Sequence, residues 1–235
     1  MKNFDLLIDE IIYLRENFLV FDELLAHPSL NQAAVEQVRQ LGCMPAASYT
    51  MRFDVRLASE IFGMSTIDGE MEFFPKTIVY WLASAQLLLE ECGGDRISKT
   101  LESRFKLAFK EALIAAPGRR AGHPECFPDG RLDDKALDKA ADRAWGHFME
   151  GTYGVCLHYQ TPANVVRKHI VVATLEGVLD RVRKGQPVDR HEALAALESY
   201  EELGMPFAPH DRHLSSRNHV YRPVARHLGI EMQEG

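Results

Sequence analysis

The sequence has 235 residues, of which 46% are hydrophobic and 26% are charged, with 16 Gly and 11 Pro. These values are typical of globular proteins and exclude collagenous, low-complexity and disordered chains. No apolar run approaches the roughly 20 residues that span a bilayer. Three acidic residues among the first ten argue against a secretory signal. We therefore expect a cytoplasmic protein whose four cysteines are free thiols.

The net charge of −7 is unevenly distributed along the chain. Residues 1–92 carry 6 basic and 14 acidic side chains, a net of −8, whereas residues 93–235 carry 21 and 20, a net of +1. An acidic surface repels the phosphate backbone of nucleic acids and anionic lipid headgroups. We therefore expect neither nucleic acid nor a membrane as a partner.

The N-terminal elements are predicted to be short helices followed by a hairpin. Apolar spacing favours helices over 4–15, 21–27 and 32–41, with Asn31 and Gly42 capping the third. Apolar and polar side chains then alternate in strand-like segments within residues 49–74, which predicts a β-hairpin. One helical turn is predicted at 57–62 inside its loop. This order resembles a winged helix of the MerR type. We predict a winged-helix-like module over residues 1–75.

The rest of the chain is predicted to be helical. Pro75 suits the first position of an apolar helix over 76–91, and Thr161 with Pro162 suits the start of a helix of about 20 residues. Residues 116–131 are rich in Gly and Pro and read as a linker or surface loop. The predicted fold class is mainly α, with the module packed on a helical domain over 76–235. Further helices are expected over 97–115, 133–150, 190–203 and 222–228.

Three groups of segments carry a family resemblance. They are ENFLVFDELLAHPSL with LGCMPAASY, GTYGVCL with TPANVVRK, and MPFAPHDR with SSRNHVYRPVARHLG. Together they resemble an uncharacterised bacterial family of about this length, described as natural-product biosynthesis proteins of unknown function. The resemblance implies a cytoplasmic role in making a small molecule. It implies no reaction and no catalytic residues.

Histidines and cysteines in the middle of the chain raise the question of a metal site. His123 and Cys126 have plausible ligand spacing, and His147, Cys156 and His158 follow. A structural zinc site usually contains two tight pairs, which this set lacks. Cys156 and His158 would also point to opposite faces of an extended segment. We predict no metal site and interpret the set as surface histidines with a buried thiol, although the sequence leaves metal binding open.

The segment GTYGVCLHYQTP is the first candidate for a functional site. Its Cys156 lies just before a predicted helix N-terminus, where the pKa of a thiol can fall and the thiolate can act as a nucleophile. The same N-terminus, with Arg167 and Lys168 one turn further on, can hold a carboxylate or phosphate. The alternative is a small apolar cysteine packed beneath two helices. The predicted substrate-binding residues here are Tyr153, Thr161, Asn164 and Arg167.

The C-terminal segment PHDRHLSSR is the second candidate. His210 beside Asp211 suits acid–base catalysis, and Arg212 and Arg217 suit the binding of an anionic substrate. The alternative is a solvated basic segment that pairs with the acidic N-terminal part. Because the chain lacks a G-x-G-x-x-G and a P-loop motif, we expect no classical dinucleotide or ATP site, and the cofactor stays unassigned.

These observations predict a protein that binds an anionic metabolite between residues 151–162 and 209–217. It would be a tailoring enzyme if Cys156, His210 and Asp211 are catalytic. Two other classes remain open, a metabolite-sensing winged-helix regulator and a non-catalytic partner of a biosynthetic enzyme. A homodimer is compatible with each of them.

Overall fold

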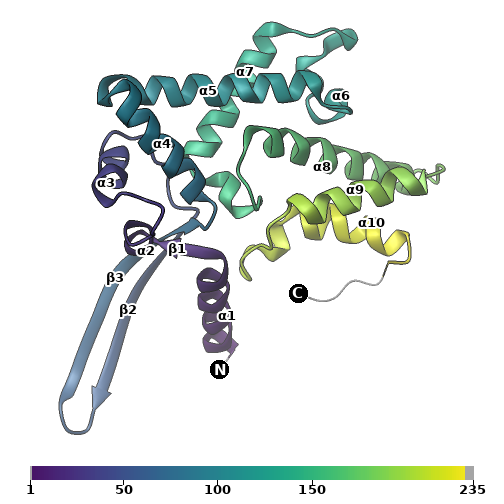
Figure 1. Ribbon diagram of the computed structural model, residues 1–235. Helices are drawn as coiled ribbons and strands as arrows, with labels where there is room; N and C mark the ends of the chain where they lie inside the picture. Colours follow the sequence, from purple (N-terminus) through teal and green to yellow (C-terminus); the bar gives the residue numbers. More distant parts are fainter. Residues whose placement is uncertain (1, 231–235) are drawn as a thin grey trace.

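The computed structural model describes residues 2–230 and, for side chains, residues 5–230. Its N-terminal part alternates short helices with strands, and the long hairpin β2–β3 extends from the body of the molecule (Figure 1). Its elements are α1 (Lys2–Asn17), β1 (Phe18–Val20), α2 (Phe21–Leu25), α3 (Gln32–Gln40), β2 (Tyr49–Ser59) and β3 (Gly63–Pro75).

The remainder is helical, so the prediction of a mainly α fold is confirmed. Helices α8 and α9 lie side by side, and α10 follows beneath them in the view of Figure 1. The elements are α4 (Ile78–Cys92), α5 (Gly94–Ala115), α6 (Arg119–Gly122), α7 (Asp134–Met149), α8 (Pro162–Arg183), α9 (Arg190–Leu203) and α10 (Arg222–His227).

The three strands form one antiparallel sheet in the order β1–β3–β2. The hairpin pairs without interruption from Tyr49 opposite Phe73 to Ser59 opposite Gly63. The expected helical turn at 57–62 is therefore wrong, because the alternating residues up to Ser59 continue the strand. The three-residue strand β1 pairs with the end of β3 and was not predicted.

Several helices begin at a residue whose side chain caps them. The carboxamide of Asn31, the carboxylate of Asp133 and the hydroxyl of Thr161 each accept a hydrogen bond from a backbone N–H of the first turn that follows. The predicted role of Pro75 is wrong, because Pro75 ends β3 and α4 begins at Ile78. Proline has no N–H to donate, and the end of a strand tolerates that loss.

Buried apolar side chains form three clusters. One joins α2, α3, α4 and the first half of α5, ending at Leu101. A second, larger cluster runs from Phe105 through α7, α8, α9 and α10. Trp81 of α4 contacts both clusters, and its indole ring packs against Phe148 with centroids 4.6 Å apart. A third, smaller cluster joins α1 and the base of the sheet to Met205 and Ala208.

The turn at residues 151–154, which contains two glycines, packs closely against the N-terminal part. Gly151 has φ 76°, and a Cβ at this residue would lie 2.4 Å from the carbonyl oxygen of Ala46. A Cβ at Gly154 would lie 2.9 Å from Cγ of Pro75, the last residue of β3. The hydroxyl of Ser48 donates a hydrogen bond of 2.8 Å to the carbonyl of Gly151. Only glycine permits this close contact.

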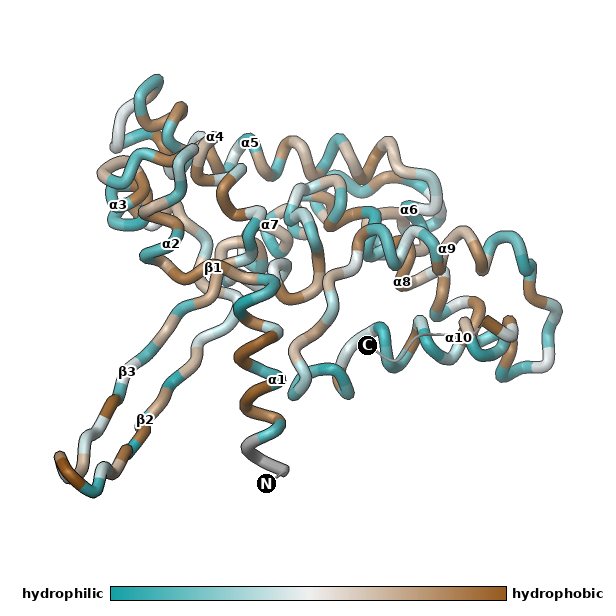
Figure 2. Tube along the Cα trace, turned by 60° about the horizontal axis from the view of Figure 1, so that its bottom comes forward, coloured by the Kyte–Doolittle hydropathy of each residue, from teal (hydrophilic) through white to brown (hydrophobic). Residues whose placement is uncertain are grey.

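Two projecting elements expose apolar side chains. Figure 2 shows hydrophobic stretches along α1 and at the end of the β2–β3 hairpin. At the hairpin end, Ile61 and Phe62 are 83% and 88% exposed. Within residues 2–230, no helix combines the length and hydropathy that crossing a bilayer requires.

Candidate functional site

A cavity of about 680 Å³ lies in the helical part, between α8 and the segments that pack on it. Its walls are mostly apolar. They come from the loop before α7, the turn that precedes α8, α8 itself, and two residues near the C-terminus. The lining residues are Ala121, Gly122, Pro124, Thr152, Tyr153, Val155, Cys156, Leu157, Val165, Lys168, His169, Val172, Ala173, Glu176, Phe207 and Ser216.

Backbone pairing brings the two distant walls together. Leu157 forms a β-bridge with Gly204, and the N–H of His158 donates a hydrogen bond of 3.0 Å to the carbonyl of Leu203. The N–H of Met205 in turn donates to the carbonyl of Cys156 at 3.3 Å. These bonds hold the segment after α9 beside residues 156–158, so Phe207 completes the cavity wall.

Lys168 is the charged side chain of the cavity wall that is most deeply buried. The residue is only 6% exposed, and its Nζ lies 3.5 Å from the centroid of the Tyr200 ring. Among the residues that the structure describes, Nζ has no hydrogen-bond partner. Burial lowers the pKa of Lys168 to about 8, because an ammonium group loses hydration inside the protein.

Two hydroxyl groups lie near Lys168, and one of them belongs to Ser216 in the cavity wall. The hydroxyls of Tyr200 and Ser216 are 2.7 Å apart and share a hydrogen bond. Ser216 lines the cavity, and the Lys168 ammonium lies over the face of the Tyr200 ring in a cation–π contact. Lys168 and Ser216 thus line the cavity, and Tyr200 packs behind both of them.

Cys156 also lines the cavity, but its chemistry differs from that expected of a nucleophile. Burial raises the pKa of the Cys156 thiol, and the nearby Lys168 charge opposes this effect only in part. Of the two alternatives, the packed cysteine therefore agrees with the structure and the lowered pKa does not. Cys156 precedes α8 by several residues, and it lies outside the first turn, where a helix terminus stabilises a thiolate. It is a neutral thiol at pH 7.

A pair of histidines lies on the other side of the cavity. His169 lines the cavity, and its Nδ1 is 3.1 Å from Nε2 of His123. Burial lowers the pKa of His169 to about 4 and also lowers the pKa of His123. Both rings are therefore neutral at pH 7, and one nitrogen of the pair donates to the other.

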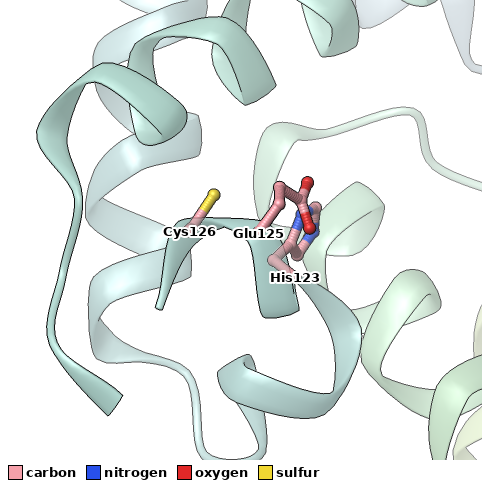
Figure 3. Close-up of side chains that lie close together, drawn as sticks. All are labelled: His123, Glu125 and Cys126. Carbon is pink, nitrogen blue, oxygen red and sulfur yellow. The ribbon is translucent and has the colours of Figure 1, made fainter. Parts of the chain in front are cut away.

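His123 and Cys126 lie in one turn with Glu125 (Figure 3). His147 instead contacts Glu150, with Nδ1 3.3 Å from the carboxylate. His123 and Cys126 are buried, so the predicted linker at 116–131 is not a simple surface loop. It contains α6, which packs against α8, and two 3-10 turns, the first of which packs against α7.

The predicted acid–base pair lies elsewhere. Nε2 of His210 is 3.3 Å from Asp211, but its Nδ1 is 3.0 Å from the carboxylate of Glu10 in α1. Neither residue lines the cavity. His210 also packs edge-on against the Tyr49 ring, so the pair belongs to the contact between α1, the sheet and residues 206–211.

The predicted anion-binding residues have partners within the chain. Arg167 pairs with Glu202, and Arg217 forms two hydrogen bonds with Glu201. Arg212 donates to the carbonyl of Phe207. At the N-terminus of α8, Thr161 caps the helix and Asn164 donates to the carbonyl of Tyr159. Of the predicted site residues, the cavity therefore brings together Cys156 and Tyr153.

The sequence analysis did not identify His169 or Tyr200, and it placed Lys168 at the start of α8 as an anion binder rather than in a buried cavity wall with Ser216. Lys168 follows Val165 by three residues and precedes Val171 by three, so it occupies the buried stripe of α8. A lysine at a position where the helical spacing predicts a buried apolar residue was the signal in the sequence that could have identified Lys168.

Residues 101–227 match the model of a family of unknown function, DUF6058. The chain belongs to the DUF6058 family. Every residue that lines the cavity falls within the matched region, whereas α1 to α4 and the hairpin precede it. No curated protein matches the chain, and no solved structure does.

Proposed function

We propose that this DUF6058 protein binds a mainly apolar small molecule with one acidic group in the 680 Å³ cavity. The observation that carries the proposal is the buried Lys168 ammonium, which has no hydrogen-bond partner among the described residues. Nζ is fully buried against the Tyr200 ring, so a carboxylate on the ligand would supply that partner after a rotation of the Lys168 side chain towards the cavity.

The cost of burying Lys168 supports this proposal. An unpaired charge in an apolar environment destabilises the folded state, and a single cation–π contact offsets only about 1–2 kcal/mol of that cost. A charge-assisted hydrogen bond from a bound carboxylate contributes about 1.5–3 kcal/mol. The ligand would therefore bind most tightly with its acidic group at the Lys168 end.

The rest of the wall supports an apolar ligand body. Val155, Leu157, Val165, Val172 and Phe207 all line the cavity. Small-molecule sites commonly have volumes of about 300–1,000 Å³, with apolar walls and few polar groups. Burial of apolar ligand surface would provide affinity, and Lys168 would provide orientation.

Decanoate and decan-1-ol test the proposal because they share a chain and differ in the acidic group. We expect the wild-type protein to bind decanoate more tightly at pH 7 in isothermal titration calorimetry. Lys168→Met should weaken decanoate binding by about 10–100-fold and leave decanol binding unchanged. Val172→Trp, which fills the cavity, should weaken the binding of both compounds.

Lys184→Met is the matched control. Lys184 directly follows α8 and forms an exposed pair with Asp180, so this variant should bind decanoate like the wild type. Equal decanoate affinity of Lys168→Met and the wild type would refute the role of Lys168. Unchanged binding in Val172→Trp would place the ligand outside the cavity.

The N-terminal part supports a more specific proposal about its fold. The element order α1–β1–α2–α3–β2–β3, with β1–β3–β2 in the sheet, is compatible with a winged helix. Arg39, the only basic residue of α3, pairs with Glu72 and lies over the Phe21 ring. Because this cation is already engaged, we favour a protein-contact role for the module over DNA binding. A part in natural-product biosynthesis stays a proposal.

A further inference from the structure

We propose that the turn containing His123, Glu125 and Cys126 binds one zinc-type divalent ion. One potential ligand atom from each residue lies within 4.8 Å of the other two. Nδ1 of His123 is 3.6 Å from Oε1 of Glu125. Ligands of a tetrahedral zinc ion, bound at about 2.0–2.3 Å, lie about 3.3–3.7 Å apart. Figure 3 shows the His123 ring and the Glu125 carboxylate together and the Cys126 thiol to one side, so a rotation of the thiol towards them would bring the three groups onto one ion.

Local backbone structure places the three side chains together. Residues Pro124–Cys126 form a 3-10 turn in which the N–H of Cys126 donates to the carbonyl of His123 at 3.1 Å. The turn keeps His123 and Cys126, three residues apart, close to each other, with Glu125 between them. Gly122 allows the turn to pack closely against α8, because a Cβ at this residue would lie 2.8 Å from the backbone nitrogen of Ile170.

The donor set suits zinc. A thiolate, an imidazole and a carboxylate are the three side-chain types that zinc accepts, and three protein ligands leave a fourth position for water or substrate. A polar pocket of about 190 Å³ adjoins His123 and Glu125 and gives room for that fourth ligand. Harder cations such as Mg²⁺ and Ca²⁺ prefer oxygen donors, so the thiol argues against them.

Neighbouring side chains orient the proposed ligands. Nε2 of His123 lies 3.1 Å from Nδ1 of His169, so its Nδ1 can face the ion. Arg143 donates at 2.8 Å to Oε1 of Glu125, the same oxygen that faces Nδ1 of His123, and so holds this carboxylate oxygen towards the proposed ion. Such outer partners are typical of metal sites. Since His169 also lines the 680 Å³ cavity, the proposed ion would lie one imidazole ring away from the cavity wall.

Equilibrium dialysis of the untagged, full-length protein against Zn²⁺, followed by metal analysis, tests the site. We expect one tightly bound zinc ion per chain. Glu125→Gln and Cys126→Ala should each weaken zinc binding at least tenfold. Glu125→Gln is the more secure variant, because the Glu125 side chain is 43% exposed and its amide replacement keeps the same shape. Glu150→Gln and Cys43→Ala serve as matched controls and should bind zinc like the wild type.

Cobalt substitution gives a second readout that a purely structural role would not change. The Co²⁺-loaded protein should show a thiolate-to-cobalt charge-transfer band, which Cys126→Ala should abolish and Cys43→Ala should preserve. Absence of stoichiometric zinc binding would overturn the proposal. Unchanged zinc affinity in both Glu125→Gln and Cys126→Ala would overturn it as well, because the ion would then bind elsewhere. Neither result depends on the ligand proposed for the cavity.

Discussion

Lys168 occupies a position on α8 where the helix would otherwise place an apolar side chain. Its pKa of about 8, compared with an ordinary value of 10.5, shows that the protein disfavours the charged form. One pKa unit corresponds to 1.36 kcal/mol, so the shift represents a cost of roughly 3 kcal/mol to the folded state. A residue that weakens the fold in this way is typical of a functional site.

Replacement of Lys168 should therefore stabilise the protein. We expect Lys168→Met to raise the free energy of unfolding by about 1–3 kcal/mol at pH 7, since methionine fills similar space without charge. The control is Lys184→Met, which removes an exposed charge and should change stability by less than about 0.5 kcal/mol. Urea denaturation measures both variants. A large loss of stability in Lys168→Met would show that the ammonium stabilises the fold.

The gain from Lys168→Met should also depend on pH. Between pH 8 and 10.5, the unfolded lysine binds a proton that the folded lysine has lost, so the stability of the wild type rises with pH. The gain should be complete below about pH 8 and should shrink towards pH 10.5. A gain that is constant over this range would contradict the lowered pKa.

Local sequence predicted part of the candidate site. Cys156 and Tyr153 line the cavity, and their segment stood out through its glycines. His210, Arg167 and Arg217 looked functional because they are polar and clustered, but each pairs with a carboxylate contributed by another element. Such pairing depends on tertiary structure, so the sequence alone could not separate an engaged side chain from a free one.

At the scale of elements, helices were more predictable than strands. Asn31, Asp133 and Thr161 cap helices through bonds to residues within three positions, which the sequence displays directly. Strand β1 has three residues, and its partner lies 55 positions later. A segment this short has no period of its own, and only the fold brings its partner to it.

The turn at 151–154 should be intolerant of side chains. We expect Gly151→Ala to lower the free energy of unfolding by about 2 kcal/mol or more, because the new Cβ meets the Ala46 carbonyl and φ is 76°. The matched control is Gly177→Ala. Gly177 lies within α8, where an added Cβ meets no described atom within 4 Å, and the change should stabilise by about 0.5–1 kcal/mol. Thermal unfolding compares them. Equal effects would contradict the close contact at Gly151.

At the scale of the whole molecule, α1 and the β2–β3 hairpin project from the body, and both contain hydrophobic stretches (Figure 2). Exposed large apolar side chains occur on both elements, among them Leu6, Ile12, Leu57, Ile61, Phe62 and Ile67. Apolar surface gathered on projecting elements is typical of an interaction surface.

The end of the hairpin should contribute nothing to folding. We expect the double change Ile61→Asn and Phe62→Asn to alter the free energy of unfolding by less than about 0.5 kcal/mol, since both side chains are over four-fifths exposed. Phe18→Ala, at a residue that is 1% exposed, should instead cost about 3–5 kcal/mol. Chemical denaturation gives both values. Comparable losses would mean that the end of the hairpin packs against the folded body.

The close fit between the glycine turn and the end of β3 has a mechanical consequence. The 13 residues of β3 span about 40 Å, and the strand ends at Pro75, against the turn that carries Tyr153. The base of the hairpin therefore lies against residues 153–157, which form one wall of the cavity. We expect a protein bound at the hairpin end to shift the base of β3 and, with it, this cavity wall.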